Sequence, residues 1–499
     1  MTRDQVVVVG AGIGGLAAAA DLARRGAQVT VCDSQATVGG KMGVVHTPAG
    51  AVDSGPTVLT MRWVFDAIFA DAGERLSDHV ELLPADILAR HAWAAGGQLD
   101  LFAAQARTID AIGAFAGAAE AAGYRRFAAR AAEIHHTLLR PYLTAELPGM
   151  IGLARRIGWT HLMKLWRIDP LRPLWSALGD YFHDPRLRQL FGRYATYVGA
   201  SPWAAPATLM LISDVERAGV WRVRGGVHRL ALALADLARR QGAVWRPGAR
   251  VTQIITERGR VRAVELADGE RIVADAVVWN GDVSALADRL RPVPPTPAAA
   301  RSLSAVTWCM AARVSGFELA HHNVFFGTDY ADEFAAIFAR RTVTAAPTVY
   351  VCAQDRAEPP TRADAPERLL ALINAPADGQ AVRPAMAAQW GARAWEVMAR
   401  CGLRIDPVEA AMPIGPAEFA ARYPATGGAL YGRVGHGARG GFVRPGARGR
   451  VEGLYLAGGS VHPGPGMPMA ALSGRIAAAR LLEDRAGRRN QVVRIDPGG

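Results

Sequence analysis

The chain has 499 residues, which is more than one hydrophobic core holds and enough for two or three interleaved domains. Its 50% hydrophobic and 20% charged residues are ordinary for a globular protein and exclude long disorder. A net charge of +12 favours an anionic partner such as lipid headgroups, and solvated arginine-rich faces explain it equally well. No nucleic-acid recognition motif accompanies the charge, so no nucleic-acid partner is predicted.

The cysteines and the hydropathy pattern limit the compartment. Cys32, Cys309, Cys352 and Cys401 are widely spaced and form no metal-ligand pattern, which indicates a reducing compartment and no bound metal. No run of 18 or more apolar residues occurs, so no membrane-spanning segment is predicted. We therefore expect a cytoplasmic protein, either free or resting on a membrane surface.

The first residues contain a dinucleotide-binding turn. A buried strand is predicted for residues 6–9, a GxGxxG turn follows, and a helix is predicted for 16–25. The first glycine allows the tight turn, the second lets a pyrophosphate approach the backbone, and the third lets the helix pack close to the strand. The helix N-terminus adds N–H donors for the phosphates. The predicted cofactor-binding residues here are Gly10, Gly12, Ile13, Gly14 and Gly15.

An acidic residue follows the second predicted strand, residues 28–31. Asp33 lies about 20 residues beyond the glycines, where a carboxylate accepts hydrogen bonds from a ribose 2′-hydroxyl. It would repel a phosphorylated ribose, which argues against NADP. At this point NAD and FAD both remain open.

Two further runs carry a family resemblance. Gly39 and Gly40, followed by Lys41, give the backbone a second approach to a diphosphate. They resemble the glycine-glycine-cation element of flavoproteins in the amine-oxidase and phytoene-desaturase superfamily. The run that contains Gly55, Pro56 and Thr57 resembles the D-x-G-P-T run of bacterial-type phytoene desaturases. The resemblance implies FAD rather than NAD.

The C-terminal region carries a second part of the same resemblance. Residues 454–468 are similar to the family signature LYL-x-G-x-x-x-H-P-G-x-G-[IM]-P, and a helix is predicted for 470–482. This strand, loop and helix are expected to present N–H groups to the diphosphate and to the flavin pyrimidine edge. The resemblance also implies that the backbone of Val251 touches the adenine. The C-terminal residues predicted to bind the cofactor are Gly458, Gly459, Gly466, Met467 and Pro468.

The chain thus resembles the bacterial-type carotenoid desaturases from end to end, and this implies the fold. We expect an α/β protein with a Rossmann-type FAD-binding domain of the amine-oxidase and phytoene-desaturase kind and an inserted α+β substrate domain. The FAD-binding domain is predicted in three parts, 1–84, 223–292 and 423–499. A helical, membrane-facing substrate insertion is predicted for 85–222, and a substrate-domain sheet for 293–422.

Hydrophobic spacing predicts the individual elements. Helices are expected at 62–72, 108–122, 124–139 and 230–240, and strands at 250–256, 261–266, 276–279, 304–314, 323–327, 348–353 and 369–375. If residues 150–167 are helical, basic side chains lie opposite Trp and Leu, as in an interfacial membrane helix or a core helix with a solvated face. His321 and His322 are interpreted as a polar turn rather than a metal pair, and Gly225 and Gly226 as a close backbone contact near the cofactor.

The resemblance implies an FAD-dependent desaturase of acyclic carotenoids, with C-3,4 desaturation of 1-hydroxylated substrates as the expected reaction. The end of an apolar tunnel should offer a polar partner to the tertiary alcohol, because an unpaired buried hydroxyl costs a few kcal/mol. No catalytic base can be assigned. Candidates are Asp169, Asp180, His161 and Glu216, and each is expected to be an ordinary surface or capping residue.

Several alternatives stay open at this point. A phytoene desaturase or a carotenoid isomerase would share the fold and the motifs, whereas an amine oxidase would need an aromatic cage and a flavin-adjacent lysine that the sequence does not indicate. A non-catalytic prenyl-lipid carrier of the GDP-dissociation-inhibitor type is the alternative outside the enzymes. The electron acceptor is expected to be a quinone or oxygen. We expect peripheral association with anionic lipid on the inner or intracytoplasmic membrane.

Overall fold

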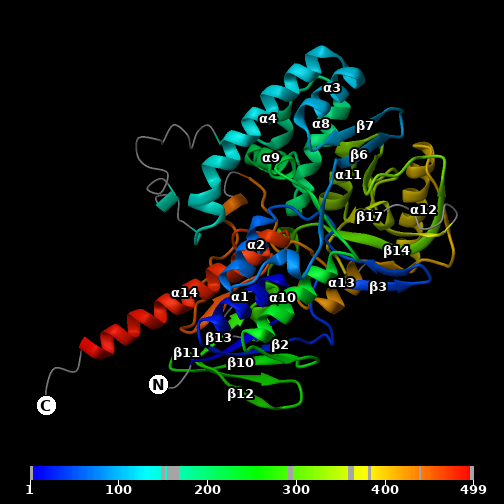
Figure 1. Cartoon of the computed structure of the whole chain (residues 1–499). Helices are drawn as coiled ribbons and strands as arrows, with labels where there is room; N and C mark the ends of the chain where they lie inside the picture. The colour runs from blue at the N-terminus through cyan, green and yellow to red at the C-terminus, as the bar shows by residue number, and fades with distance from the viewer. Residues whose placement is uncertain are drawn as a thin grey trace, which may run out of the picture.

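The computed structural model describes residues 4–147, 152–153, 168–289, 296–357, 365–379, 384–437 and 440–494. A five-stranded parallel sheet forms the nucleotide-binding part (Figure 1), and its strand order is β20-β13-β1-β2-β9. The strands are β1 (Gln5–Val9), β2 (Gln28–Cys32), β9 (Val244–Arg246), β13 (Ala276–Trp279) and β20 (Leu454–Leu456). They come from three distant parts of the chain.

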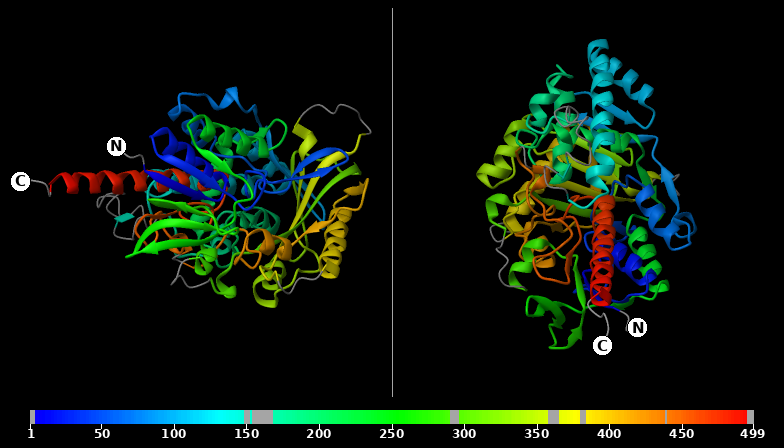
Figure 2. Two further views of the ribbon diagram at one scale, coloured as in Figure 1. Left: turned by 90° about the horizontal axis from the view of Figure 1, so that it is seen from below. Right: turned by 90° about the vertical axis from the view of Figure 1, so that its left-hand side faces the viewer.

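Three helices pack together beside this sheet. They are α1 (Ile13–Arg24), α10 (His228–Arg240) and α14 (Met467–Arg494), and α1 contacts both of the others. α1 begins three residues before the predicted start, and α14 extends beyond both ends of the predicted 470–482. Figures 1 and 2 show the last part of α14 extending away from the body of the molecule. α2 (Trp63–Asp71) contacts α1 and α14.

The second sheet has eight strands. Its order is β18-β14-β17-β16-β15-β6-β7, with β19 beside β14, and every pairing is antiparallel except that of β15 with β6. The strands are β6 (Ile87–Trp93), β7 (Gln98–Phe102), β14 (Ser304–Ser315), β15 (His322–Phe326), β16 (Val349–Ala353), β17 (Glu367–Ala375), β18 (Arg404–Pro407) and β19 (Pro413–Ile414). α12 (Pro384–Arg400) packs on this sheet through buried residues such as Trp390.

A layer of helices lies at one end of the molecule (Figure 1). It consists of α3 (Gln105–Ala116), α4 (Ala118–Leu138), α7 (Leu174–Leu178), α8 (Pro185–Gly192) and α9 (Leu211–Arg217). Phe127, Phe182 and Phe191 are fully buried between these helices. The predicted helices 108–122 and 124–139 meet instead at Gly117, whose φ of 96° ends one helix and starts the next.

The expectation that 85–222 is helical is wrong over its first part, because β6 and β7 form a hairpin there. Arg90 and Asp100 are charged residues within these strands, so the sequence pattern does not indicate the hairpin. These residues face each other across the two strands, and Arg90 Nε donates to Asp100 Oδ1 at 2.9 Å. The polarity of each side chain is therefore satisfied by the cross-strand partner rather than by solvent.

The remaining elements are short. They are β3 (Val44–Thr47), β4 (Gly50–Asp53), β5 (Leu82–Pro84), β8 (Trp221–Val223), β10 (Val251–Glu257), β11 (Arg260–Leu266), β12 (Arg271–Val273), α11 (Tyr330–Ala335) and α13 (Pro416–Arg422). Of the amphipathic stretch 150–167, all but Gly152 and Leu153 lies outside the described residues. Within the described ranges, no helix combines the length and the apolar character needed to cross a bilayer.

Candidate active site

A cavity of about 1010 Å³ extends from the nucleotide-binding sheet to the helical layer. In a parallel sheet all carboxyl ends lie at one edge, and here that edge holds Gly10, Asp33, Asn280 and Gly458, each following a strand. Every residue predicted to bind the cofactor lines this cavity except Gly15. The topology thus brings the N-terminal and C-terminal glycine clusters to the same place.

The first glycine turn has the geometry that its sequence predicts. Gly10 has a φ of 101°, a conformation that glycine adopts without strain. A Cβ at Gly15 would lie 2.1 Å from the carbonyl oxygen of Gly10, so this glycine lets α1 approach β1 and does not face the cavity. Gly39 donates its N–H to Ala11 O at 2.9 Å, and a Cβ at Gly40 would lie 3.2 Å from Gly12 Cα. The second glycine pair therefore packs directly on the first turn.

The C-terminal glycine cluster packs against the N-terminal glycine turn, and together the two form a backbone cradle. A Cβ at Gly14 would lie 2.8 Å from Ala470 O and 3.0 Å from Gly458 N. These backbones approach each other because neither turn carries a side chain at the contact. The first turns of α1 and α14 both adjoin the cavity, and their free N–H groups suit a diphosphate.

Asp33 is buried, with 9% of its surface exposed, and its carboxylate is already oriented. Oδ2 accepts from Ala11 N at 2.6 Å and Oδ1 accepts from Gln35 N at 2.8 Å. Burial raises the pKa of this carboxyl, while the two backbone N–H groups act in the opposite direction. The remaining lone pairs of the carboxylate are available to ribose hydroxyls at the end of β2.

Asn280 is a site residue that the sequence reasoning missed. Its Nδ2 donates to Gly10 O at 3.0 Å, so its side chain holds the first glycine turn. Its Oδ1 is buried without a hydrogen-bond partner in the described structure, and it lies beside the cradle. An orphaned acceptor together with a glycine-lined hollow fits a bound group that carries donors, as a dinucleotide does. The signal was the Asn-Gly-Asp run after β13.

Two basic residues, the half-buried Lys41 and the buried Arg444, line the same cavity. Lys41 donates through Nζ to Leu430 O, and burial lowers the pKa of Lys41. Arg444 donates through Nη2 to Tyr431 O at 3.0 Å, and burial lowers the pKa of Arg444 to about 10. Arg444 therefore still carries a positive charge near neutral pH, which suits an anionic ligand. The sequence indicated Lys41 but not Arg444.

The glycine pair at 225–226 serves a different purpose from the one predicted. A Cβ at Gly226 would lie 2.8 Å from the Asp53 carboxylate, which accepts from Val227 N at 2.6 Å and from His228 N at 3.1 Å. Neither glycine lines the cavity. Gly226 therefore admits a buried aspartate at the start of α10, so the predicted close contact is made with Asp53.

The far half of the cavity has mostly apolar walls from the helical layer. They include Leu138, Leu143, Val198, Leu209, Ile212 and Val215. A polar corner interrupts them, formed by Arg193, Tyr197 and Glu216. Such a chamber suits a long apolar ligand with one polar group.

Among the candidate bases, Glu216 differs from the others. It is 8% exposed and lines the cavity, so the expectation of an ordinary surface or capping residue is wrong for it. Its two oxygens accept from Tyr194 Oη at 2.9 Å and from Tyr197 Oη at 2.6 Å, and burial raises its pKa. Asp169 and Asp180 instead pair with Arg172, and His161 lies outside the described residues.

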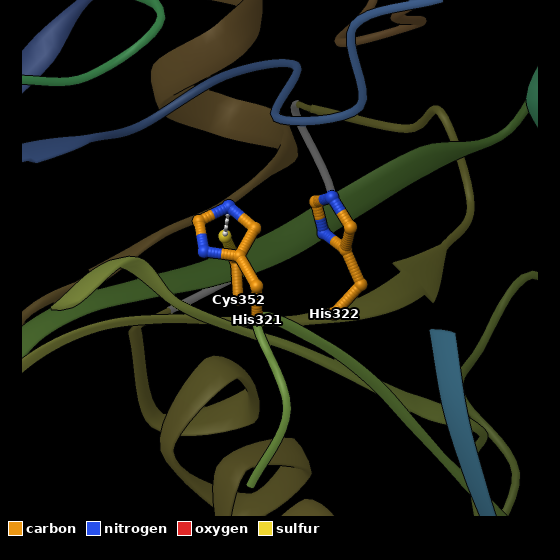
Figure 3. A group of neighbouring side chains, drawn as sticks. All are labelled: His321, His322 and Cys352. Atoms are coloured by element: carbon orange, nitrogen blue, oxygen red, sulfur yellow. Dashed lines mark hydrogen bonds between the residues drawn. The ribbon is translucent and has the colours of Figure 1, made fainter. Parts of the chain in front are cut away.

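The interpretation of His321 and His322 as a polar turn is also wrong. His322 begins β15 and is 1% exposed, and Cys352 of β16 lies opposite it (Figure 3). Cys352 Sγ lies 3.6 Å from His321 Nε2, and the three candidate ligand atoms lie within 4.8 Å of one another. Burial raises the pKa of Cys352 to about 12, so its thiol is neutral in the metal-free protein. The absence of a metal stays a prediction.

Comparison with known proteins agrees with this architecture. Residues 13–482 match the family model described as flavin containing amine oxidoreductase. The chain therefore belongs to the flavin-containing amine oxidoreductase family and is an oxidoreductase. A flavin held at a dinucleotide-binding turn identifies FAD as its cofactor.

Individual relatives refine the comparison. The chain is 50% identical to the hydroxyneurosporene desaturase of Rubrivivax gelatinosus, over 98% of this chain and 95% of the relative. It is 45% identical to the hydroxyneurosporene desaturase of Cereibacter sphaeroides, over 97% and 98%. An oxidoreductase structure from Methanosarcina mazei shares the fold, with a TM-score of 0.58, 16% identity, and coverage of 96% of this chain and 100% of that one.

Proposed function

We propose that this chain is an FAD-dependent carotenoid desaturase that removes two hydrogens from C-3 and C-4 of a 1-hydroxylated acyclic carotenoid such as 1-hydroxyneurosporene, in spheroidene-type carotenoid biosynthesis. Identities of 44–50% to three hydroxyneurosporene desaturases support the substrate class. The observation that carries the proposal is that the glycine cradle and the apolar chamber belong to one cavity. A polyene that enters the chamber therefore reaches the cofactor.

The residues of this chain position the reactants. Bound FAD supplies the hydride acceptor, and the glycine turns, Asp33, Lys41 and Arg444 would hold it. The apolar walls exclude water and hold the carotenoid in one register, which selects the bond that is oxidised. Loss of a hydride leaves an allylic cation on the substrate, and the dry chamber protects that cation from attack by water until a neighbouring proton is lost.

The test is a single turnover without oxygen. Purified holoprotein mixed with 1-hydroxyneurosporene is expected to lose its oxidised-flavin absorbance and to yield a carotenoid lighter by two hydrogens, as measured by chromatography and mass spectrometry. A product of unchanged mass would instead identify an isomerase, and binding without any change in carotenoid or flavin would identify a carrier. Adding a quinone or oxygen to the reduced protein then distinguishes the two candidate electron acceptors.

We further propose that the protein is cytoplasmic and takes its substrate from the inner or intracytoplasmic membrane. The net charge of +12 favours anionic lipid. Leu171 lines the cavity although 61% of its surface is exposed, so an apolar side chain lies at the cavity opening. An opening of this kind suits delivery of a carotenoid from a bilayer.

A Leu171→Asp variant is expected to bind anionic vesicles at least tenfold more weakly than the parent protein, because burial of one leucine contributes about 1.5–3 kcal/mol. Vesicle flotation measures this difference. Met412 is 78% exposed and does not line the cavity, so Met412→Asp is the matched control and should float like the parent. Equal flotation of both variants would contradict membrane contact at the cavity opening.

A further inference from the structure

Arg193 is a cation in the cavity whose N–H donors are mostly unused. It begins the short helix η4 (Arg193–Val198) and lines the cavity. In the described part of the chain its side chain makes one hydrogen bond, from Nη1 to Tyr197 Oη at 3.5 Å, and no carboxylate lies within ion-pair distance. A guanidinium has five N–H donors, so most of them face the cavity or neighbouring rings.

Aromatic rings hold this guanidinium in place. The central carbon of the Arg193 guanidinium lies 5.5 Å from the ring centroids of both Tyr197 and Tyr350, at cation–π distance. The Tyr197 hydroxyl is fixed by its bond to Glu216. These contacts orient Arg193, but apart from the Tyr197 hydroxyl they supply no acceptor for its N–H groups.

An otherwise apolar chamber with an oriented, unpaired donor requires an acceptor on its ligand. A pure hydrocarbon would leave the guanidinium desolvated without a partner, which is costly. A positive charge also does not stabilise the allylic cation formed by hydride loss, so electrostatics give Arg193 no favourable part in the oxidation itself. Binding of a ligand oxygen by Arg193 would both satisfy the guanidinium and give it a role outside the oxidation step.

The place of Arg193 relative to the cofactor cradle matches a 1-hydroxylated substrate. Tyr350 joins Arg193 to Thr57, because the hydroxyls of Tyr350 and Thr57 lie 2.6 Å apart. Thr57 belongs to the run expected beside FAD. In the proposed substrate only C-2 separates the carbon that bears the hydroxyl from C-3, so the alcohol must lie close to the reacting bond.

We propose that Arg193, oriented by Tyr197 and Tyr350, binds the C-1 hydroxyl oxygen of the carotenoid and is the residue that selects hydroxylated substrates. This inference rests on the proposed function. The other polar groups of this corner already have partners, since Glu216 accepts from two tyrosines and Thr57 is bonded to Tyr350. Arg193 also sets the register, because it fixes which end of the carotenoid enters next to the cofactor.

The test measures equilibrium binding rather than turnover, using 1-hydroxyneurosporene and its non-hydroxylated counterpart, neurosporene, with purified holoprotein. The parent is expected to bind the hydroxylated carotenoid roughly 10- to 100-fold more tightly, as for a hydrogen bond to a charged group. Arg193→Met should bring the ratio of the two dissociation constants close to one. Arg188→Met is the matched control and should keep the parent ratio, because Arg188 donates to Phe182 O and does not line the cavity.

The outcomes separate this inference from the proposed function. A parent ratio near one, or an undiminished ratio in Arg193→Met, overturns the inference even if desaturation is observed. A preference that depends on Arg193 supports it even if no product forms. If Arg193→Met loses flavin and binds both carotenoids more weakly by the same factor, Arg193 contacts the cofactor instead. That result overturns the inference. If Arg193→Met does not fold, Arg193→Lys must lower the ratio at least severalfold, because an ammonium lacks the planar donor array.

Discussion

A Gly474→Ala variant is expected to lose its FAD and to unfold at a lower denaturant concentration than the parent protein. Gly474 lies on α14 where this helix crosses α1, and a Cβ there would lie 1.9 Å from Gly14 O and 3.2 Å from Ala18 N. Both atoms belong to backbone, so they cannot move aside as a flexible side chain would. The helices must separate, which costs about 3 kcal/mol or more.

The Gly474→Ala substitution is expected to weaken FAD binding because Gly14 belongs to the N-terminal glycine turn. Displacing α14 also moves Gly458 and the start of α14 away from that turn, so the two halves of the cradle no longer meet. The measurements are the flavin-to-protein absorbance ratio after gel filtration and urea unfolding of the holoprotein.

Gly487 supplies a control on the same helix. A Cβ at this position would meet no atom within 4 Å, and the residue is exposed. Gly487→Ala is therefore expected to keep the flavin and to add about 0.5–1 kcal/mol of helix stability. If Gly474→Ala retained flavin as well as Gly487→Ala does, the close crossing of α1 and α14 would not hold the cradle together.

The cofactor half of the site could be predicted because its geometry is local in sequence. A glycine turn between β1 and α1 forces the backbone toward a ligand, and an acid at the end of β2 lies beside it in any fold of this kind. For Gly226 the same reasoning predicted a close contact but not its partner, because Asp53 is distant in sequence. A glycine pair indicates a close approach but does not identify what approaches.

The substrate half could not be predicted for a related reason. Arg193, Tyr197 and Glu216 lie on short helical turns and would each pass for surface residues. Only the tertiary structure pairs the buried Glu216 with two tyrosines and brings the three residues together at the cavity. Likewise, the sequence did not indicate that His322 is a core residue, because Cys352 and Tyr350 belong to a different strand that pairs with β15.

Acid is expected to destabilise the protein steeply below about pH 6.5 because three histidines are buried in the neutral form. Burial lowers the pKa of His91 to about 3 and that of His321 to about 4, and it lowers the pKa of His322 well below its ordinary value. In the unfolded chain each takes up a proton near pH 6.5. Below that pH the unfolded state binds more protons, so the free energy of unfolding falls as the pH falls.

The size of the effect follows from the number of groups. Each histidine lowers the free energy of unfolding by about 1.4 kcal/mol per pH unit, from about pH 6.5 down to its folded pKa. Three together approach about 4 kcal/mol per pH unit, a large share of the 5–15 kcal/mol typical of folded domains. Burial raises the pKa of Glu216 and Glu333, so these carboxyls take up protons in the folded state and offset part of the loss.

A variant comparison isolates the histidine contribution, because the carboxyl contributions cancel. His91→Gln retains a donor for Leu99 O, which lies 3.2 Å from His91 Nδ1, but it does not titrate. Urea unfolding at pH 6.5, 5.75 and 5.0 should show a mean slope smaller by about 1.1 kcal/mol per pH unit than that of the parent, because the unfolded histidine is only half protonated at pH 6.5. Gln substituted for the exposed His46 is the control, and a His91→Gln slope equal to that of this control would mean that His91 is not held neutral by the fold.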